Sequence, residues 1–217
     1  MVVVLSVQII GQQNGDKEEG GGETKAKQLP SLEFLQECFD LTDKGLFWKE
    51  RPLCHFKTSK SCAVFNAKYS GKLAGYLHKN NKYTEVGLDG VLYKIHRIIY
   101  KLAYKEEPIG IVDHVDGNKL NNLPNNLRLA TSQENARNSN TRITGSKSSK
   151  YKGVSAGRNG SWISCLTIDD TLVRVVFDSE EEAALDYHKR ASAMFGEFYR
   201  LCPNTKKLLD RSGVTYG

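Results

Sequence analysis

The strongest constraint on how this chain can fold is a continuous run that predicts a strand, an ordered loop, a second strand and a helix in succession. Ile109 to Val112 is a short apolar run typical of a strand, and Asp113 and His114 follow it directly. Asparagine, aspartate and glycine are frequent over residues 116–126, and these residues favour tight turns that bond their own main chain. We therefore expect a compact, self-bonded loop directly after the first strand.

The segment after this loop predicts a return strand and a helix. Residues 127–130 form the expected strand, and Thr131 with Glu134 three residues later is a capping-box signature for a helix start. Asn135 lies in the first turn of that helix. We expect the helix to return Asn135 to the side of Asp113, which makes the whole a finger-like unit.

The residue types in this unit suit the hydrolysis of a phosphodiester. Neighbours on a strand point to opposite faces, so Asp113 and His114 can reach different partners if the strand twists at its end. A histidine with an unperturbed pKa of about 6.5 can take a proton from water near neutral pH. One carboxylate oxygen from Asp113 and one amide oxygen from Asn135 could hold a Mg²⁺ ion that keeps several waters.

The segment 96–138 resembles the HNH endonucleases of phages and mobile introns, the ββα-metal nuclease group. The resemblance is carried, in order and spacing, by Val-Asp-His-Val-Asp-Gly-Asn-Lys-Leu-Asn-Asn from Val112, Asn-Leu-Arg-Leu-Ala-Thr from Asn126, and Glu-Asn from Glu134. It implies that the catalytic residues are His114, the general base, and Asn126, which staples the loop. It also implies that Asp113 and Asn135 are the ligands of one Mg²⁺ or Mn²⁺ ion.

A further histidine, His96, stands near the start of an expected amphipathic helix. At such a position core packing, a phosphate contact and catalysis are all open. We leave His96 out of the catalytic set.

Composition favours a nucleic-acid partner over a membrane. The chain has 217 residues and a formal net charge of +6, which favours a polyanion. No apolar run approaches the roughly 20 residues that span a bilayer. The apolar start, residues 1–10, lacks the basic segment and cleavage site of a secretory signal.

The cysteines do not predict a disulfide scaffold or a zinc finger. Their number is odd and no Cys-x-x-Cys pair is present; they are Cys38, Cys54, Cys62, Cys165 and Cys202. We expect reduced thiols in a cytosolic compartment.

The chain predicts three parts with tails and a linker between them. A flexible tail is expected at 1–28, a β-rich N-terminal region at 29–95, the nuclease unit at 96–138, a linker at 139–149, a C-terminal domain at 150–202 and a tail at 203–217. The clearest signal in the β-rich region is Asp89-Gly90, which predicts a two-residue hairpin between Tyr83–Leu88 and Val91–Ile95. Trp48 is expected in the core of this region.

The C-terminal domain predicts a three-stranded antiparallel sheet with one packed helix. Strands are expected at 151–155, 162–168 and 172–177, and Ser179 with Glu182 caps the helix. The face expected to cover the sheet consists of Ala183, Tyr187, Ala191, Met194 and Phe198. The other face of the sheet is then free for a ligand such as the DNA major groove.

This domain resembles the ethylene-response-factor (AP-two) DNA-binding domain. The matching residues are Tyr-Lys-Gly-Val from Tyr151, Trp162, Phe-Asp-Ser-Glu-Glu-Glu-Ala-Ala-Leu-Asp-Tyr from Phe177, and Phe-Gly-Glu-Phe from Phe195. The strands supply Lys152, Arg158 and Arg174, with Ser155 and Thr167, as candidate DNA contacts. Three basic residues in or beside the linker complete the candidate set: Arg142, Lys147 and Lys150.

Taken together, the sequence predicts an α+β protein that cleaves DNA with a divalent metal, of the homing or mobile-element type. A non-catalytic DNA-binding or regulatory protein is the alternative from another class. Cleavage of RNA, or of DNA without site preference, is also open because basic residues bind any phosphate backbone. We expect DNA as the partner, no membrane, a monomer, and a cytoplasmic location in a host cell, or a nuclear or organellar one in a eukaryote.

Overall fold

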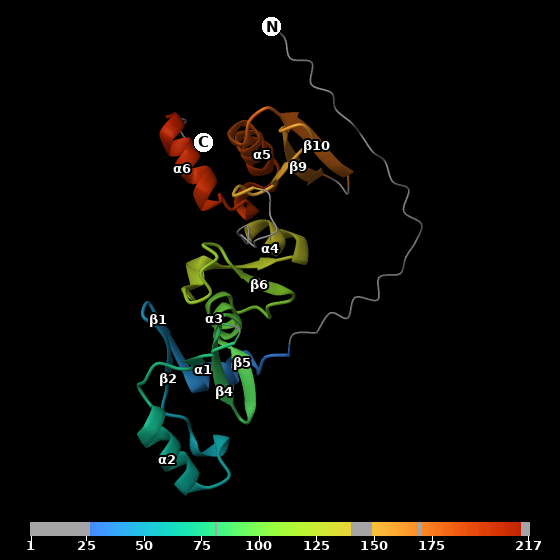
Figure 1. Cartoon of the computed structure of the whole chain (residues 1–217). Coiled ribbons are helices and arrows are strands. Elements are labelled where there is room, and N and C mark those ends of the chain that lie inside the picture. Colours follow the sequence, from blue (N-terminus) through green and yellow to red (C-terminus); the bar gives the residue numbers. More distant parts are fainter. Residues whose placement is uncertain (1–26, 81, 140–148, 169–170, 214–217) are drawn as a thin grey trace. The chain divides into compact units, whose positions relative to one another are not determined.

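The structure is a computed structural model that describes residues 27–80, 82–139, 149–168 and 171–213 (Figure 1). These residues divide into two compact units, one that ends at Asn135 and one that begins at Ala136. Each unit mixes helices with small antiparallel sheets, which agrees with the expected α+β class. Every helix among the described residues is too short or too polar to span a lipid bilayer.

The N-terminal unit consists of short helices and strands. In chain order they are α1 (Leu32–Cys38), β1 (Phe39–Thr42), β2 (Gly45–Trp48), η1 (Leu53–His55), α2 (Ser59–Tyr69), β3 (Tyr76–Leu77), β4 (Thr84–Leu88), β5 (Val91–Lys94), α3 (Ile95–Tyr104), β6 (Ile111–His114), η2 (Pro124–Asn126), β7 (Leu127–Ala130) and then α4 (Ser132–Asn138), of which the residues up to Asn135 belong to this unit. The strands pair as β1-β2, β3-β4-β5 and β6-β7. The segment 71–76 supplies the first residue of β3 and a bridge from Leu73 to Phe47.

The hairpin predicted at Asp89-Gly90 is confirmed. β4 and β5 pair with Leu88 opposite Val91, so only two residues turn the chain. Asp89 has φ 51° and Gly90 has φ 80°, the left-handed backbone that this kind of turn requires. Because β5 ends at Lys94 and α3 begins at Ile95, the hairpin feeds directly into the central helix of the unit.

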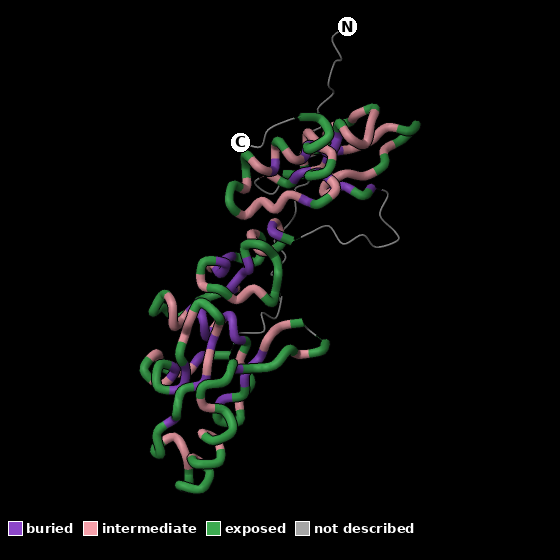
Figure 2. The backbone as a smooth tube through the Cα atoms, turned by 90° about the vertical axis from the view of Figure 1, so that its left-hand side faces the viewer, coloured by how far each residue is buried: buried purple, intermediate pink, exposed green. Residues whose placement is uncertain are grey.

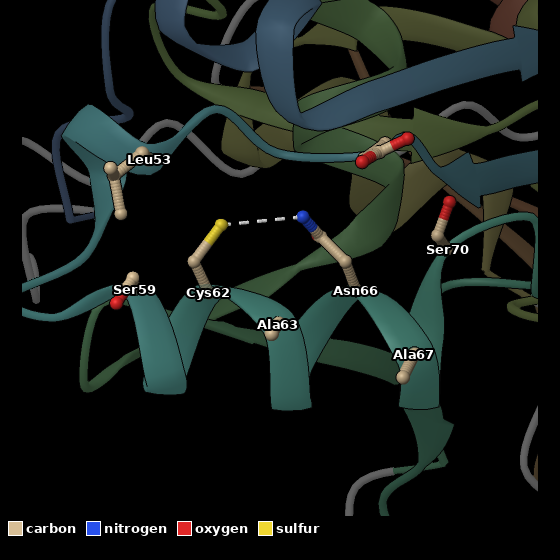
Figure 3. Close-up of a pocket in the computed structure, with 8 residues that line it drawn as sticks. Leu53, Ser59, Cys62, Ala63, Asn66, Ala67 and Ser70 are labelled. Carbon is tan, nitrogen blue, oxygen red and sulfur yellow. Dashed lines mark hydrogen bonds between the residues drawn. The ribbon is translucent and has the colours of Figure 1, made fainter.

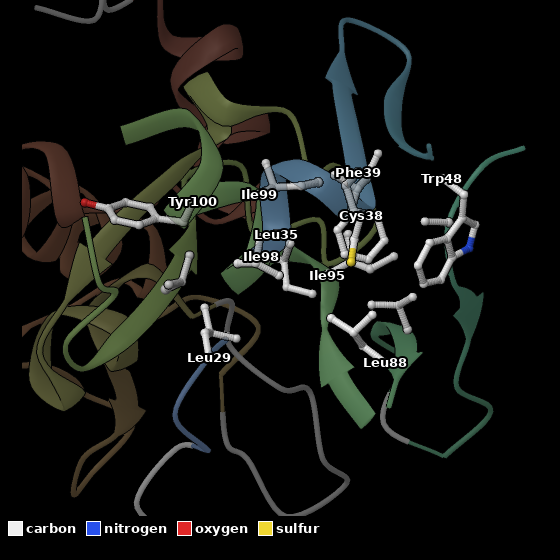
Figure 4. Close-up of a cluster of buried hydrophobic side chains, with 14 of the residues drawn as sticks. Leu29, Leu35, Cys38, Phe39, Trp48, Leu88, Ile95, Ile98, Ile99 and Tyr100 are labelled. Carbon is white, nitrogen blue, oxygen red and sulfur yellow. The ribbon is translucent and has the colours of Figure 1, made fainter. Parts of the chain in front are cut away.

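The core of the N-terminal unit gathers around α3 (Figure 4), and Figure 2 marks the buried residues along the backbone. Ile98 and Ile99 are fully buried, and Leu35 of α1 and Leu88 of β4 pack into the same cluster. Trp48 is 5% exposed, as the sequence predicted for a core residue. In contrast, α2 has no buried residue. The stable part of this unit is therefore the side that carries α3 and the elements packed on it.

One buried arginine joins α1 and α2 to the turn between β4 and β5. Arg51 is 3% exposed and its guanidinium lies 4.9 to 5.6 Å from the ring centroids of Phe34, Phe56 and Phe65. Its Nη2 donates to the Asp89 carboxylate at 2.9 Å. A buried cation needs such partners because an unpaired one would cost several kcal/mol, of the order of 3 to 5.

The C-terminal unit is a sheet covered by a helix, with a second helix after it. Its elements are β8 (Val154–Ala156), β9 (Trp162–Ile168), β10 (Thr171–Phe177), α5 (Glu180–Phe195), η3 (Gly196–Phe198) and α6 (Pro203–Ser212). The three strands form an antiparallel sheet, as predicted, in the order β10-β9-β8. Ser179 caps α5 by accepting from the Glu182 amide at 3.2 Å, as predicted, and the helix ends at Gly196.

Contacts between sheet and helix depend on small residues. Ala183 and Ala191 of α5 are fully buried, which lets the helix approach β9 closely. Gly153 has φ 73°, and a side-chain carbon there would lie 2.0 Å from the Tyr187 ring. Glycine is thus required at position 153 both for its backbone angle and for the space that Tyr187 occupies.

Two sequence expectations for this unit are wrong. Met194 is 45% exposed, and Phe195 packs on the sheet in its place because the last turn of α5 rotates the next residue inward. The stretch expected as a tail from residue 203 forms helix α6, whose Thr205 and Leu209 are buried. The unit therefore has two packed helices and not one.

Candidate functional site

The predicted finger-like unit is present as β6, a long loop, β7 and α4. β6 and β7 pair antiparallel with Asp113 opposite Arg128 and His114 opposite Leu127. The capping box at the start of α4 is formed, with the Glu134 carboxylate accepting from the Thr131 amide at 2.7 Å. The hairpin ladder thus holds Asp113 and His114 at the end of a paired strand, directly before the loop.

The loop between β6 and β7 is bonded to itself through Asp116. The Asp116 carboxylate accepts from the Asn118 amide at 2.7 Å, from Asn121 Nδ2 at 2.8 Å and from Asn126 Nδ2 at 2.9 Å. Partial burial would raise the pKa of Asp116, but these hydrogen bonds outweigh it and lower the pKa. Asp116 therefore stays ionised at the centre of the loop.

Asn126 joins the two ends of the same loop. Its Oδ1 accepts from the Asp116 amide at 3.0 Å, and its Nδ2 donates to the Asn121 carbonyl at 2.7 Å as well as to the Asp116 carboxylate. The side chain is 8% exposed. This geometry agrees with the stapling role that the sequence suggested for Asn126.

His114 is held by a residue that the sequence analysis missed. The ring is 4% exposed, and its Nε2 lies 2.9 Å from Asn122 Oδ1. An amide oxygen can only accept, so neutral His114 carries its hydrogen on Nε2 and its lone pair on Nδ1. The only hint in the sequence was the asparagine pair Asn121-Asn122 within the loop.

Asp113 is paired with a cation across the hairpin. Arg128 Nε and Nη2 donate to Asp113 Oδ2 at 3.2 and 3.1 Å, and both side chains are nearly buried, at 7% and 11% exposed. Arg128 is the second residue whose part the sequence did not indicate. It fixes the carboxylate and compensates its charge.

The donor chemistry at Asp113 fits a hard cation. The described residues contain no cluster of three or more His, Cys, Asp or Glu side chains that could hold a metal ion. An ion at Asp113 would therefore take its other ligands from amide, phosphate and water oxygens, which Mg²⁺ accepts. Asn135, half-buried in the first turn of α4, is the amide that the sequence proposed, and its pairing with Asp113 stays a prediction.

His114 lies in a group of three aromatic rings. The His96 ring centroid is 5.0 Å from that of His114 and 5.2 Å from that of Tyr83, and Tyr83 and His114 are 6.3 Å apart. His96 is 5% exposed. The sequence left this histidine open, and the structure brings it into van der Waals range of the proposed base.

Arg97 holds the start of the site strand. Its Nη1 donates to the Gly110 carbonyl and its Nη2 to the Pro108 carbonyl, both at 2.7 Å. These bonds tie the segment before β6 to the first turn of α3. Both Nη atoms of the guanidinium thus donate to main-chain carbonyls, while its Nε is buried without a hydrogen-bond partner among the described residues, and the side chain acts as a structural tether.

The predicted DNA-binding residues of the C-terminal unit differ in whether their charged groups already bind other residues of the protein. Lys150 Nζ lies 3.8 Å from Glu180 and 3.9 Å from Glu181. Lys152 Nζ donates to the Arg137 carbonyl, and burial lowers the pKa of Lys152 to about 8. Arg158 and Arg174 are exposed and form no ion pair with a described residue.

Arg142 and Lys147 lie outside the described residues. Arg174 stands on the sheet face opposite α5, since it pairs with Cys165 while the neighbouring Leu166 is buried under the helix. This is the face that the sequence analysis expected to be free.

A groove of about 600 Å³ along α2 is separate from this site (Figure 3). Its walls are Glu50, Leu53, Ser59, Cys62, Ala63, Asn66, Ala67 and Ser70. Asn66 Nδ2 donates to the Arg51 carbonyl at 2.9 Å, and the Cys62 thiol is 3.5 Å from the same oxygen. The main polar groups in the groove therefore serve to hold Arg51.

Comparison with known proteins places the site within a recognised domain. Residues 93–137 match the family model described as HNH endonuclease. An uncharacterised HNH endonuclease of Acanthamoeba polyphaga mimivirus is 38% identical over 108 residues, which cover 48% of this chain and 54% of the relative. The DNA endonuclease I-HmuI of Bacillus phage SP01 is 34% identical over 97 residues, covering 42% of this chain and 54% of that protein.

A third similar protein is a putative HNH homing endonuclease derived from the SPbeta prophage of Bacillus subtilis. It is 35% identical over 80 residues, which cover 36% of this chain and 42% of the relative. The chain spans about half the length of the relatives it matches. No solved structure matches it significantly. The segment that carries Asp113, His114 and Asn135 thus matches the HNH endonuclease family model.

The Asn126 staple predicts a local loss of stability on mutation. Asn126→Ala removes three hydrogen bonds and leaves the Asp116 amide without its partner, so it should cost about 1–3 kcal/mol. Asn125→Ala is the matched control, because Asn125 is exposed and forms no side-chain hydrogen bond with a described residue. Amide hydrogen exchange at Asp116 and Asn118 should accelerate in the first variant only. Equal exchange in both variants would contradict the staple.

Proposed function

We propose that this protein is a DNA endonuclease that hydrolyses phosphodiester bonds with one divalent metal ion, of the homing or mobile-element type. The observation that carries the proposal is the bond from His114 Nε2 to Asn122 within a segment that matches the HNH endonuclease model. That bond leaves the basic lone pair on one defined atom of an otherwise buried ring. The names of the phage and prophage relatives support DNA as the substrate and the mobile-element class.

In the proposed reaction, His114 Nδ1 takes a proton from a water molecule whose oxygen attacks the phosphorus. The new phosphorus–oxygen bond forms as the bond to the leaving oxygen breaks, and the leaving oxygen takes a proton from solvent. His114 then returns its proton to water. Asn122 fixes the ring throughout, so the lone pair points in one direction.

Asp113 and Asn135 would hold the metal ion, which when bound would neutralise phosphate charge and stabilise the leaving oxygen. Arg128 keeps the Asp113 carboxylate in one orientation. Oxygen ligands suit both Mg²⁺ and Mn²⁺, so the site would accept either ion.

The C-terminal unit would bring the nuclease to its DNA. Its sheet has α5 on one face only, and Arg174 stands on the other with an exposed, unpaired guanidinium among the described residues. This arrangement supports the resemblance to the ethylene-response-factor domain as a DNA-reading module. Arg158, exposed in the turn between β8 and β9, would add a phosphate contact.

A metal requirement is the first test of this proposal. Excess chelator should stop the cleavage of plasmid DNA, and added Mg²⁺ or Mn²⁺ should restore it. Asn135→Ala should raise the metal concentration for half-maximal cleavage by about tenfold, the equivalent of 1.4 kcal/mol for a lost ligand. Gln133→Ala, an exposed neighbour on α4, should leave that concentration unchanged. Full cleavage in chelator would exclude the mechanism.

His114 is tested by separating cleavage from binding. His114→Ala and His114→Gln should each reduce the cleavage rate by about 10²- to 10⁴-fold, because general-base assistance is lost. Affinity for DNA, measured in chelator, should change less than about twofold, since binding depends on distributed phosphate contacts. The cleavage rate of Asn122→Ala should lie between the rates of the His114 variants and that of the wild type. Tight DNA binding without any cleavage by the wild-type protein would instead support a regulatory role.

The C-terminal proposal predicts an effect of one sheet residue on the salt dependence of binding. Arg174→Ala should weaken DNA binding and reduce the slope of log K against log salt by about one unit. Lys189→Ala is the control, because Lys189 is an exposed cation on α5, which covers the other face of the sheet. If both variants lower the slope equally, the open face is not the DNA-reading surface. A matched titration with duplex RNA tests the choice of nucleic acid.

A further inference from the structure

Two lysines from distant segments meet on one aromatic ring beside the proposed base. Lys94 Nζ lies 4.6 Å and Lys119 Nζ 4.2 Å from the ring centroid of Tyr83. Lys94 ends β5, Lys119 belongs to the loop between β6 and β7, and Tyr83 precedes β4. The Tyr83 ring also contacts His96 and lies 6.3 Å from His114.

The charges of these two lysines are not compensated within the described part of the chain. Neither ammonium forms an ion pair or a hydrogen bond with a described residue, whereas Lys101 pairs with Glu107 at 2.5 Å. A cation–π contact at an exposed site contributes only about 0.5–1 kcal/mol, so the ring orients the two ammonium groups without neutralising them.

The same place holds a helix start without a cap. Lys94 is the N-cap of α3 and makes no side-chain capping bond, and the first turn has no acidic residue. A helix start favours a negative charge, so a lysine there opposes the helix dipole by about 0.3–1 kcal/mol. The first amides of α3 and the two lysines thus form one region of positive potential that suits an anion.

His96 adds an unpartnered polar atom at this point. The ring is 5% exposed, and its Nδ1 has no hydrogen-bond partner among the described residues. Burial, with smaller effects from His114, Lys94 and Lys119, lowers the pKa of His96 to about 3. His96 is therefore neutral and can offer one hydrogen bond without adding a third positive charge.

We propose that Lys94, Lys119 and the open start of α3 form a binding site for a DNA backbone phosphate, at or next to the phosphodiester that faces His114. Tyr83 is the positioning residue that holds the two lysines. The proposal rests on the proposed nuclease function and names the part of the chain that would seat the substrate. Arg97, the other cation of this turn, is excluded because both of its Nη atoms donate to main-chain carbonyls and its Nε is buried.

The test compares two double variants of the full chain. Lys94→Gln with Lys119→Gln removes both proposed contacts, and Lys57→Gln with Lys60→Gln removes the same charge from two exposed lysines that form no contact with a described acid or ring. Tyr83→Leu keeps an apolar side chain but removes the ring on which the lysines lie. Urea unfolding of all variants checks that each is folded.

Binding is measured in two ways that do not need cleavage. Inorganic phosphate, used as the probe, should shift the backbone amide signals of Ile95, His96 and Arg97 in the wild-type protein and in the control, but not in the Lys94 and Lys119 variant. Binding of a DNA duplex in chelator should lose about 0.9 units of salt slope for each removed contact, and the control should keep its slope. Tyr83→Leu should lose part of the salt slope, less than the Lys94 and Lys119 double variant loses.

The outcomes separate this site from the nuclease function. If the Lys94 and Lys119 variant matches the control in both amide shifts and salt slope, the phosphate site is wrong, whether or not the protein cleaves DNA. If the shifts and slopes follow the proposal but wild-type protein cleaves no DNA with any divalent metal, the phosphate site stands and the nuclease function fails. Shifts with free phosphate but an unchanged DNA slope would also overturn the proposal, because the site would then not serve the DNA backbone.

Discussion

The geometry around His114 depends on the Asn126 carboxamide. Residues 115–126 leave β6 and return to β7, and an open loop of this length would carry a large conformational entropy. Asn126 offsets that entropy by bonding the Asp116 main chain, the Asp116 carboxylate and the Asn121 carbonyl at once. Only with the loop closed does Asn122 reach the His114 ring. One amide side chain thus sets both the loop and, through its neighbour, the orientation of the imidazole.

Charge at the site follows two opposite rules. Asp113 is nearly buried and is matched by Arg128 across the hairpin, because a buried carboxylate without a partner would be costly. Lys94 and Lys119 are exposed, so water solvates their charges, which form no ion pair with a described residue. A surface that keeps unmatched positive charge next to a neutral, buried His96 is suited to a polyanion. The buried ion pair of Asp113 and Arg128 holds the shape of the site, and the two exposed lysines give the site its positive charge.

Short-range signals made much of the fold predictable. The Asp89-Gly90 turn, the Thr131 and Glu134 capping box and the Ser179 cap each formed where the sequence placed them, since such motifs involve groups only a few residues apart. The three strands and first helix of the C-terminal unit were also predicted. Helix ends and exposed faces were less predictable: Met194 and Phe195 exchanged roles because one residue of helix rotation decides which side chain meets the sheet.

The sequence by itself therefore determined the local structure of the site. It predicted a strand that ends in Asp113 and His114, a loop closed by Asn126 and a helix that begins at Thr131. What only the tertiary structure decided was which distant groups meet there. Asn122 on the His114 ring, Arg128 on the Asp113 carboxylate, and Lys94 with Lys119 on Tyr83 are contacts between separate segments. The physical reason is that such pairings follow from strand register and loop closure, which are set by the packing of the whole unit and not by any run of neighbouring residues.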